Sequence, residues 1–399
     1  MRDTPRSRSR SRFPGRVEFL IGCLLVSSCA VATHGYSYRV PEQTGDGWQT
    51  ASLEDVGMDT GRMVDLMNDL SDHPDHWVHG IVVIKDGKLV FEEYFPGEDM
   101  DLSDLANGIA FAHHDFDRNT LHSAASVSKS VTSVLLGIAI DDGLVQGTQQ
   151  TMFSYFPDYA QLSDATKNQI TLQQMLTMTS GLPWNESSSY DDPQNDLVAM
   201  VASDDPIRYV LSKSTVATPG VQFTYNSGTA NLVGEIVRRA SGGTLASFAA
   251  QHLFGPLGIE SYEWYGFPHA PAMMVASSTL YLRPRDMAKI GQLYLDGGVW
   301  NGTRVVSAEW ISRSTQESVA SVESPVPALN PRYGFLWWLG TFTTGHTGTY
   351  FAAGFGGQFI FVLPELEMVV VFTAGGFQDA NYDPVLQAMN QYVLPAAGR

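Results

Sequence analysis

The sequence predicts an α+β protein, in which helices flank an antiparallel sheet and a mostly helical region interrupts it. Apolar runs of strand length occur near both ends of the chain, whereas apolar residues at helical spacing dominate the middle. Connections of hairpin length join neighbouring strand candidates, which favours antiparallel pairing. We therefore expect a discontinuous sheet domain over residues 51–149 and 291–399, with a mostly helical domain over residues 150–290.

The N-terminal segment, residues 1–32, has the pattern of an export signal. Six arginines lie within the first sixteen residues, and an apolar run from Phe19 to Val26 follows them. This run is too short to span a bilayer as a helix. The next residues, 33–50, are interpreted as a polar tether.

Two cleavage patterns fit this signal. Ala30-Val31-Ala32 suits ordinary release, whereas Val26-Ser27-Ser28-Cys29 is similar to a bacterial lipobox, which would leave a lipid on Cys29. Because Cys29 has no other evident role, the lipobox is slightly favoured. The sequence therefore predicts an exported protein, either periplasmic or anchored to a membrane through a lipidated Cys29.

Composition narrows the class of protein further. Cys23 and Cys29 are the only cysteines, so the chain after the signal can form neither a disulfide nor a cysteine metal site. Without residues 1–32, 18 basic and 40 acidic residues remain, which gives a net charge of −22. A surface this negative disfavours nucleic acid and anionic membranes as partners.

The first part of the sheet domain is predicted from a helix and a hairpin. Residues 59–70 carry apolar side chains at helical spacing. Residues 81–85 and 89–94 are strand-like and flank Asp86-Gly87, a two-residue hairpin turn signal.

A strongly apolar helix is expected from Ser126 to Asp142, with Gly143 suited to the left-handed position just after it. Further helical patterns cover residues 172–178, 196–201, 231–240, 245–252 and 286–295.

The C-terminal part returns to strand patterns. Strands are predicted over residues 333–338, 358–363 and 368–373, with Pro364–Glu367 joining the last two. A helix over residues 383–393 closes the chain.

The pair Ser126 and Lys129 carries the clearest chemical signal. Residues three apart share a helix face, so the amine can reach the hydroxyl. Apolar surroundings disfavour an ammonium ion and lower the pKa of a lysine, which could then take the proton of a nucleophilic serine. A helix-capping serine beside a lysine that extends to solvent is the alternative interpretation.

Two further segments could complete such a site. Tyr225 lies at a loop-to-helix junction, where its phenol could carry protons between nucleophile, leaving group and water. Gly354-Phe355-Gly356 precedes a predicted strand, and glycines there let backbone N–H groups approach a ligand, as an oxyanion hole requires. Taken singly, these segments also fit a core tyrosine and a glycine-rich bulge.

Together these segments resemble the serine hydrolases related to class C β-lactamases and penicillin-binding proteins, most closely the 6-aminohexanoate-dimer hydrolases and related esterases. The resemblance rests on Ser-Val-Ser-Lys-Ser at 126–130, Leu-Thr-Met-Thr-Ser-Gly-Leu-Pro-Trp at 176–184, Pro-Arg-Asp-Met-Ala-Lys-Ile at 284–290 and Gly-Phe-Gly-Gly-Gln at 354–358. It implies a β-lactamase/transpeptidase-like fold with the site between the sheet and the helical domain.

The resemblance also implies roles for individual residues. Ser126 would be the acylated nucleophile, Lys129 its base and Tyr225 the proton carrier. The residues expected to form the oxyanion hole or bind substrate are Ser126, Ser227, Gly354, Phe355 and Gly356.

The sequence departs from the family pattern at two places, and the second of them favours esters or linear amides as substrates. Ser227 stands where asparagine is common, and Ala352-Ala353-Gly354 replaces the Lys-Thr-Gly of β-lactamases. His346-Thr347-Gly348 spells the carboxypeptidase variant of that motif but is interpreted as turn residues. Without a cation on the strand, the carboxylate of a β-lactam or peptide has a weaker anchor.

The predicted function is therefore an exported serine hydrolase that acts through an acyl-enzyme, with neither metal nor cofactor. His73, His76 and His79 are evenly spaced, but Pro74 interrupts any helix there, so no metal site is expected. A β-lactamase or D-alanyl-D-alanine carboxypeptidase is the first alternative. A non-catalytic envelope-binding lipoprotein is the second.

Overall fold

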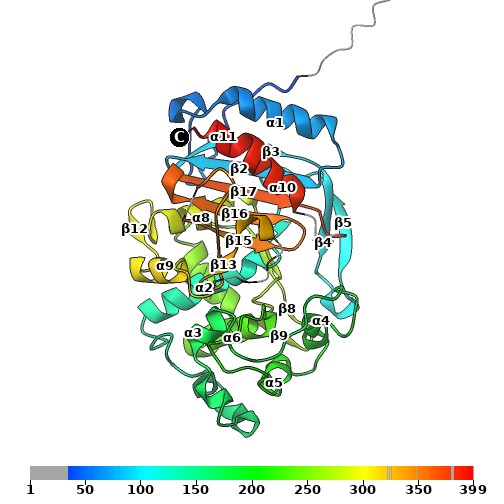
Figure 1. Cartoon of the computed structure of the whole chain (residues 1–399), viewed down its shortest axis with the longest axis vertical. Helices are drawn as coiled ribbons and strands as arrows, with labels where there is room; N and C mark the ends of the chain where they lie inside the picture. The colour runs from blue at the N-terminus through cyan, green and yellow to red at the C-terminus, as the bar shows by residue number, and fades with distance from the viewer. Residues whose placement is uncertain are drawn as a thin grey trace, which may run out of the picture. The chain divides into compact units, whose positions relative to one another are not determined.

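The core of the molecule is an eight-stranded sheet built from both ends of the chain (Figure 1). The structure, a computed structural model, describes residues 35–320, 322, 324, 326–346, 348–378 and 382–398. The predicted signal over residues 1–32, including Cys23 and Cys29, lies outside the described residues. The strand order is β1-β3-β2-β17-β16-β15-β14-β13, and every pair is antiparallel except the parallel pair β1–β3. Because β17 pairs with β2, strands from both ends of the chain lie side by side in this sheet.

The strands of this sheet have the following bounds: β1 Gln49–Thr50, β2 Val78–Lys85, β3 Lys88–Tyr94, β13 Arg332–Tyr333, β14 Trp338–Gly340, β15 Thr349–Gly354, β16 Gln358–Leu363 and β17 Met368–Ala374. The predicted hairpin between β2 and β3 is confirmed. Asp86 and Gly87 both have positive φ, 52° and 71°, as a tight two-residue turn between twisted strands requires.

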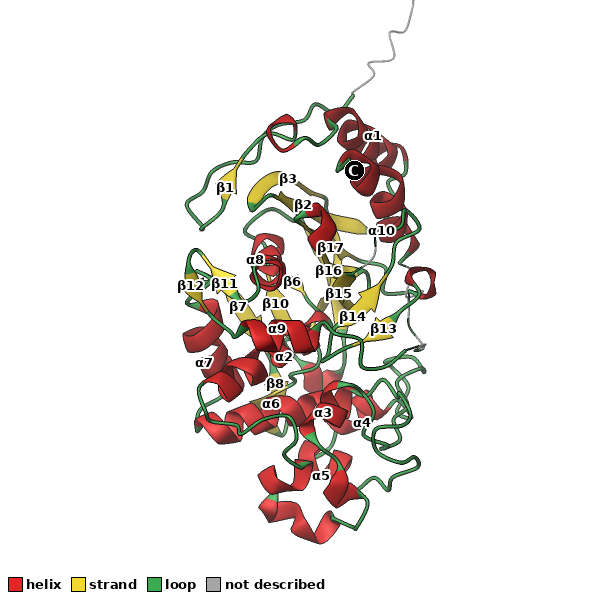
Figure 2. Cartoon of the chain, turned by 60° about the vertical axis from the view of Figure 1, so that its left-hand side comes forward, coloured by secondary structure: helices red, strands yellow, loops and turns green. Residues whose placement is uncertain are grey.

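Helices cover both faces of the sheet (Figure 2). One face carries α1, Thr60–Asp72, together with α10, Asp383–Ala388, and its continuation Met389–Val393 and α11, Leu394–Ala396. The other face carries α8, Pro284–Leu295, which packs on β2, β16 and β17. A Cβ at Gly291 would lie 2.5 Å from the Val369 Cγ1 atom, so glycine at this position lets α8 approach the sheet closely.

The remaining helices are α2 Val127–Asp141, α3 Leu172–Leu176, α4 Asp196–Val201, α5 Pro206–Leu211, α6 Ser227–Ser241, α7 Leu245–Ala249 with its continuation Ala250–Phe254, and α9 Ala308–Ser314. Helix α2 packs on α6 and also contacts β15 of the sheet. It therefore lies where the sheet meets the helical part of the chain.

Small sheets and 3-10 turns complete the fold. The small sheets are β6 His122–Ser123 with β10 Leu280–Leu282 and β7 Tyr262–Trp264; β4 Gly97–Asp101 with β5 Ala110–His114; β8 Gly266–Phe267 with β9 Ala270–Met274; and β11 Val299–Trp300 with β12 Thr303–Arg304. The 3-10 turns are Glu54–Val56, Leu105–Asn107, Met152–Tyr155, Pro157–Leu162, Lys167–Gln169, Pro327–Leu329 and Pro364–Leu366. Among the helices that the structure describes, none combines the length and the apolar character needed to cross a bilayer.

The expected polar tether over residues 33–50 is wrong for its described part. Trp48 is 2% exposed, and its indole N–H donates to the Arg285 carbonyl oxygen at 3.2 Å. The Tyr38 hydroxyl donates to the Val90 carbonyl oxygen at 2.8 Å, and β1 pairs with β3. Three aromatic and backbone contacts thus hold this segment against the sheet.

Two other boundaries also differ from the sequence prediction. The border at residue 290 cuts through α8, which belongs with the sheet because its apolar face packs there. The strand predicted over residues 333–338 is instead a corner between β13 and β14, where Leu336 has a φ of 58°. The Leu336 N–H donates to the Leu176 carbonyl oxygen, so this corner joins the sheet to α3.

Candidate active site

Ser126 is held at the N-terminus of α2 by a tightly constrained turn. The Ala124 N–H donates to the Leu280 carbonyl oxygen at 2.8 Å, which ties the residues before the helix to β10. Ala125 has a φ of 44°, a left-handed backbone conformation that is unfavourable for any residue other than glycine. Strain of this kind is concentrated at functional sites, and here it directs the next residue, Ser126, toward two cavities.

Lys129 lies directly beneath Ser126. Its side-chain Nζ donates to the Ser126 Oγ at 2.9 Å and to the Ser277 carbonyl oxygen at 3.1 Å. The residue is 1% exposed, and no ion pair with a carboxylate joins it within the described part of the chain. Burial lowers the pKa of Lys129 to about 8, although the negative charge of Glu186 raises it in part. The unprotonated amine is therefore accessible near neutral pH.

Tyr225 completes this cluster from the loop before α6. Its hydroxyl hydrogen-bonds with Ser126, and the Lys129 Nζ lies 4.8 Å from the centre of its ring. The ring stacks on Trp338 at 5.8 Å, which fixes its orientation. Burial and the charge of Glu186 raise the pKa of Tyr225 well above its usual range. The phenol therefore keeps its proton and can donate it. The structure thus brings Ser126, Lys129 and Tyr225 together.

Glu186 is a site residue that the sequence analysis missed. Its carboxylate accepts hydrogen bonds from the Ser227 hydroxyl at 2.7 Å, the Ser227 N–H at 3.3 Å and the Trp184 indole at 2.7 Å. It lies in an irregular loop between α3 and α4, where no periodic pattern marks it. The only local signal is its position two residues after Trp184, and that signal alone could not have identified it.

Backbone N–H groups suited to an oxyanion hole come from two elements. Gly354 ends β15 so close to the turn before α2 that a Cβ there would lie 2.6 Å from the Ala124 carbonyl oxygen. Among the described residues, none accepts a hydrogen bond from the backbone N–H of Ser126 or Phe355. These two donors are therefore available to a ligand at Ser126.

Two of the predicted binding residues have other roles. The prediction that Ser227 binds substrate is wrong, because its side chain is buried and both its hydroxyl and its N–H donate to Glu186. Gly356 lines neither cavity at Ser126, and its carbonyl oxygen accepts the Gly376 N–H. His346 lies in the loop that precedes β15, at the opposite end of the strand from Gly354, as expected for a loop residue.

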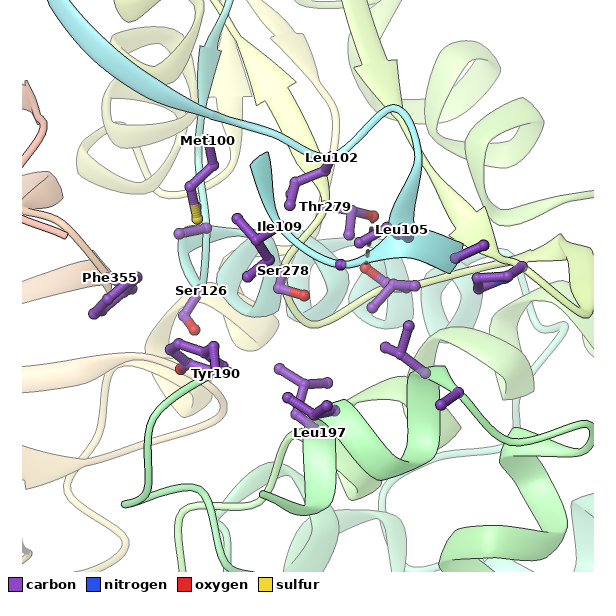
Figure 3. A pocket seen from close by; sticks show the side chains of 18 of the residues that line it. Met100, Leu102, Leu105, Ile109, Ser126, Tyr190, Leu197, Ser278, Thr279 and Phe355 are labelled. Atoms are coloured by element: carbon purple, nitrogen blue, oxygen red, sulfur yellow. Dashed lines mark hydrogen bonds between the residues drawn. The ribbon is translucent and has the colours of Figure 1, made fainter. Parts of the chain in front are cut away.

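Two cavities meet at Ser126. An apolar cavity of about 340 Å³ extends between the β4–β5 connection and α4 (Figure 3). A larger cavity of about 1210 Å³ contains Tyr225, Glu186 and Trp338. Tyr190 and Phe355 line both cavities, and their rings form an edge-to-face pair 5.0 Å apart.

The three evenly spaced histidines do not converge on one point. His73 contacts the Asp69 carbonyl oxygen, His76 packs edge-on against Phe95, and His79 shares a hydrogen bond with His122 at 2.9 Å. Among the residues that the structure describes, no three histidine, cysteine or carboxylate side chains are arranged to hold a metal ion.

The sequence profile of the Beta-lactamase family matches residues 62–389. The chain belongs to the Beta-lactamase family. The β-lactamase/transpeptidase-like fold expected from the resemblance is thereby confirmed.

Two curated relatives of this Beta-lactamase family member are hydrolases. The 6-aminohexanoate-dimer hydrolase of Paenarthrobacter ureafaciens is 24% identical over 63% of this chain and 65% of its own length. The lovastatin esterase of Penicillium rubens is 25% identical over 44% of this chain and 46% of its own length. The chain therefore spans less than two thirds of either relative. A family VIII carboxylesterase has the same fold, with a TM-score of 0.63 and 17% identity over 84% of this chain and 96% of its own.

Proposed function

We propose that this protein is an exported serine hydrolase that cleaves esters or linear amides through an acyl-enzyme on Ser126. The observation that carries the proposal is the 2.9 Å contact between the Ser126 hydroxyl and a buried Lys129 whose pKa is lowered to about 8. A fully buried lysine without a carboxylate partner is costly to a fold, and activation of a nucleophile accounts for that cost.

The reaction begins with attack on the substrate carbonyl. Lys129 takes the hydroxyl proton while the Ser126 Oγ bonds to the carbonyl carbon, and the N–H groups of Ser126 and Phe355 stabilise the oxyanion. Tyr225 donates its proton to the departing oxygen or nitrogen and regains one from Lys129. Water then attacks the acyl carbon, and its proton passes through Tyr225 and Lys129 to the Ser126 Oγ. The bond between this oxygen and the acyl carbon breaks, which releases the free acid and restores the serine hydroxyl.

The charge of the site supports esters and linear amides over β-lactams and cell-wall peptides. Ala352 and Ala353 precede Gly354 on β15, so this part of the strand offers no cation. Glu186 instead places a carboxylate in the larger cavity. A β-lactam or a D-alanyl-D-alanine peptide carries a carboxylate of its own, and like charges at short range repel.

Export is proposed from the N-terminal pattern of arginines and apolar residues alone. Attachment to a membrane through a lipid on Cys29 is part of the same proposal. The alternative role, a non-catalytic envelope-binding lipoprotein, does not explain why a strained turn at Ala125 and a buried Lys129 without a carboxylate partner occur at the same site.

A substrate panel tests the proposed reaction. Purified protein should hydrolyse p-nitrophenyl esters and short linear amides at least a hundredfold faster than nitrocefin, a chromogenic β-lactam. Intact-mass measurement during turnover should detect one acyl group per chain. Nitrocefin turnover that equals ester turnover would instead identify a β-lactamase, and a folded protein that cleaves neither would overturn the proposal.

The pH dependence of turnover should report on Lys129. Because only the unprotonated amine can take the serine proton, kcat/KM for a neutral ester should rise with pH and level off above about pH 8. Glu186→Gln should move the midpoint to lower pH, since the charge of Glu186 favours the ammonium form. A midpoint that moves to higher pH in this variant would contradict the assignment.

A further inference from the structure

The two cavities at Ser126 have opposite character, and each is suited to a different part of a substrate. We propose that the apolar cavity binds the acyl chain, and that the larger cavity binds the leaving group and favours one with a positive charge. This inference rests on the proposed function. It names the substrate class as esters or amides of medium-chain hydrocarbon acids with a cationic leaving group.

The position of Tyr225 sets the direction in which a substrate binds. The departing atom must lie next to the group that protonates it. Tyr225 lines the larger cavity but not the apolar one, so the leaving group belongs in the larger cavity. The acyl chain, on the other side of the same carbonyl carbon, then extends into the apolar cavity.

The apolar cavity is shaped for a hydrocarbon chain. Figure 3 shows Ser126, Tyr190 and Phe355 on one side of it and Leu105 toward the other. Its lining includes Met100, Leu102, Leu105 and Ile109 from the β4–β5 region, and Leu197, Val198 and Val201 from α4. A methylene is about as large as a water molecule, roughly 30 Å³, so about 340 Å³ holds at most about eleven methylenes, which is enough for a chain of about eight to ten carbons.

The larger cavity is suited to a cation. Glu186 is the only acidic or basic side chain among the described residues that line it. Hydrogen bonds from Trp184 and the buried Ser227 fix its carboxylate in place. An anionic leaving group would meet the same carboxylate unfavourably.

Acyl selectivity is measured with p-nitrophenyl esters from acetate to dodecanoate. In the wild type, kcat/KM should rise about fourfold per methylene until the cavity is full, near eight to ten carbons. Val201→Phe should lower the octanoate-to-acetate ratio about tenfold or more, and Val198→Phe serves if that variant unfolds. Val216→Phe is the matched control, because Val216 is 72% exposed and lines neither cavity. Equal ratios in the wild type and in folded filling variants would overturn the acyl assignment.

Leaving-group selectivity is measured with octanoyl esters of choline, ethanol and glycolate, followed by titration of released acid. The wild type should prefer the choline ester to the glycolate ester, and Glu186→Gln should reduce that ratio about five- to tenfold, an effect that weakens as salt is added. An unchanged ratio would overturn the role of Glu186. If the wild-type protein did not hydrolyse p-nitrophenyl acetate, the proposed function itself would be overturned. If it hydrolysed this ester but selected neither for acyl-chain length nor for leaving-group charge, only this inference would be overturned.

Discussion

Replacing Ser126 with alanine should abolish labelling by a fluorophosphonate probe and lower kcat by about 10⁵-fold or more, as in other enzymes with a nucleophilic serine. Without the hydroxyl, no acyl-enzyme can form. The matched control is Ser130→Ala, since Ser130 lies one turn further along α2 and its hydroxyl donates to the Leu336 carbonyl oxygen. This control should label and turn over like the wild type.

Two results would contradict the nucleophile assignment. Labelling that persists in Ser126→Ala at the wild-type stoichiometry would place the reactive hydroxyl elsewhere. A folded wild-type protein that does not label at all would instead favour the non-catalytic binding role. Thermal unfolding of each variant separates either result from simple loss of structure.

Replacing Lys129 with methionine should have opposite effects on activity and stability. Loss of the base should lower kcat about 10³- to 10⁴-fold. Removal of a buried amine with no carboxylate partner should raise the free energy of unfolding by about 1–3 kcal/mol at pH 7. Urea unfolding and ester turnover measure the two effects on the same preparations.

The stability gain should depend on pH in a defined direction. Between about pH 8 and 10.5 the unfolded chain holds a proton on Lys129 that the folded protein has released, so wild-type stability rises with pH in this window. The advantage of Lys129→Met should therefore shrink and be lost above pH 10.5. A constant advantage across this range would show that Lys129 titrates alike in both states.

Lys289 provides the contrasting control. It is as deeply buried as Lys129 but forms an ion pair with the buried Asp286 at 2.8 Å. Lys289→Met should therefore destabilise the fold by about 1–3 kcal/mol, because the buried carboxylate of Asp286 loses this partner and keeps only its ion pair with Arg283. If both substitutions changed stability in the same direction, the distinction between an unpaired and a paired lysine would be wrong.

Sequence patterns predicted the parts of the fold that local forces determine. The Asp86-Gly87 turn, the helix after Ser126 and the strands on either side of Pro364 each depend on residues close in the chain. The corner at Leu336 escaped prediction, because a run rich in aromatic, strand-forming side chains bends there to meet α3. Trp48 likewise packs against residues more than two hundred positions away, which no local pattern reveals.

The site divides in the same way. Ser126 and Lys129 share one helix turn, so their contact follows from spacing alone. Glu186 lies in a loop, and its carboxylate is held by hydrogen bonds from Trp184 and from Ser227, which is 41 residues away. Ser227 was assigned to substrate binding because its neighbours in the sequence suggested a motif. In the structure its hydroxyl donates a hydrogen bond to the carboxylate of Glu186, which is distant in the sequence and lies next to Ser227 only in the folded chain.

The two-residue strand β1 covers part of one edge of the large sheet. By pairing with β3, it occupies backbone groups at one margin of the large sheet, and Trp48 fixes it there against Trp300. A chain shortened to start after residue 50 would expose that margin as a row of unsatisfied donors and acceptors, a template for edge-to-edge aggregation. We therefore expect residues 36–50 to lower the tendency of this sheet edge to pair with another chain.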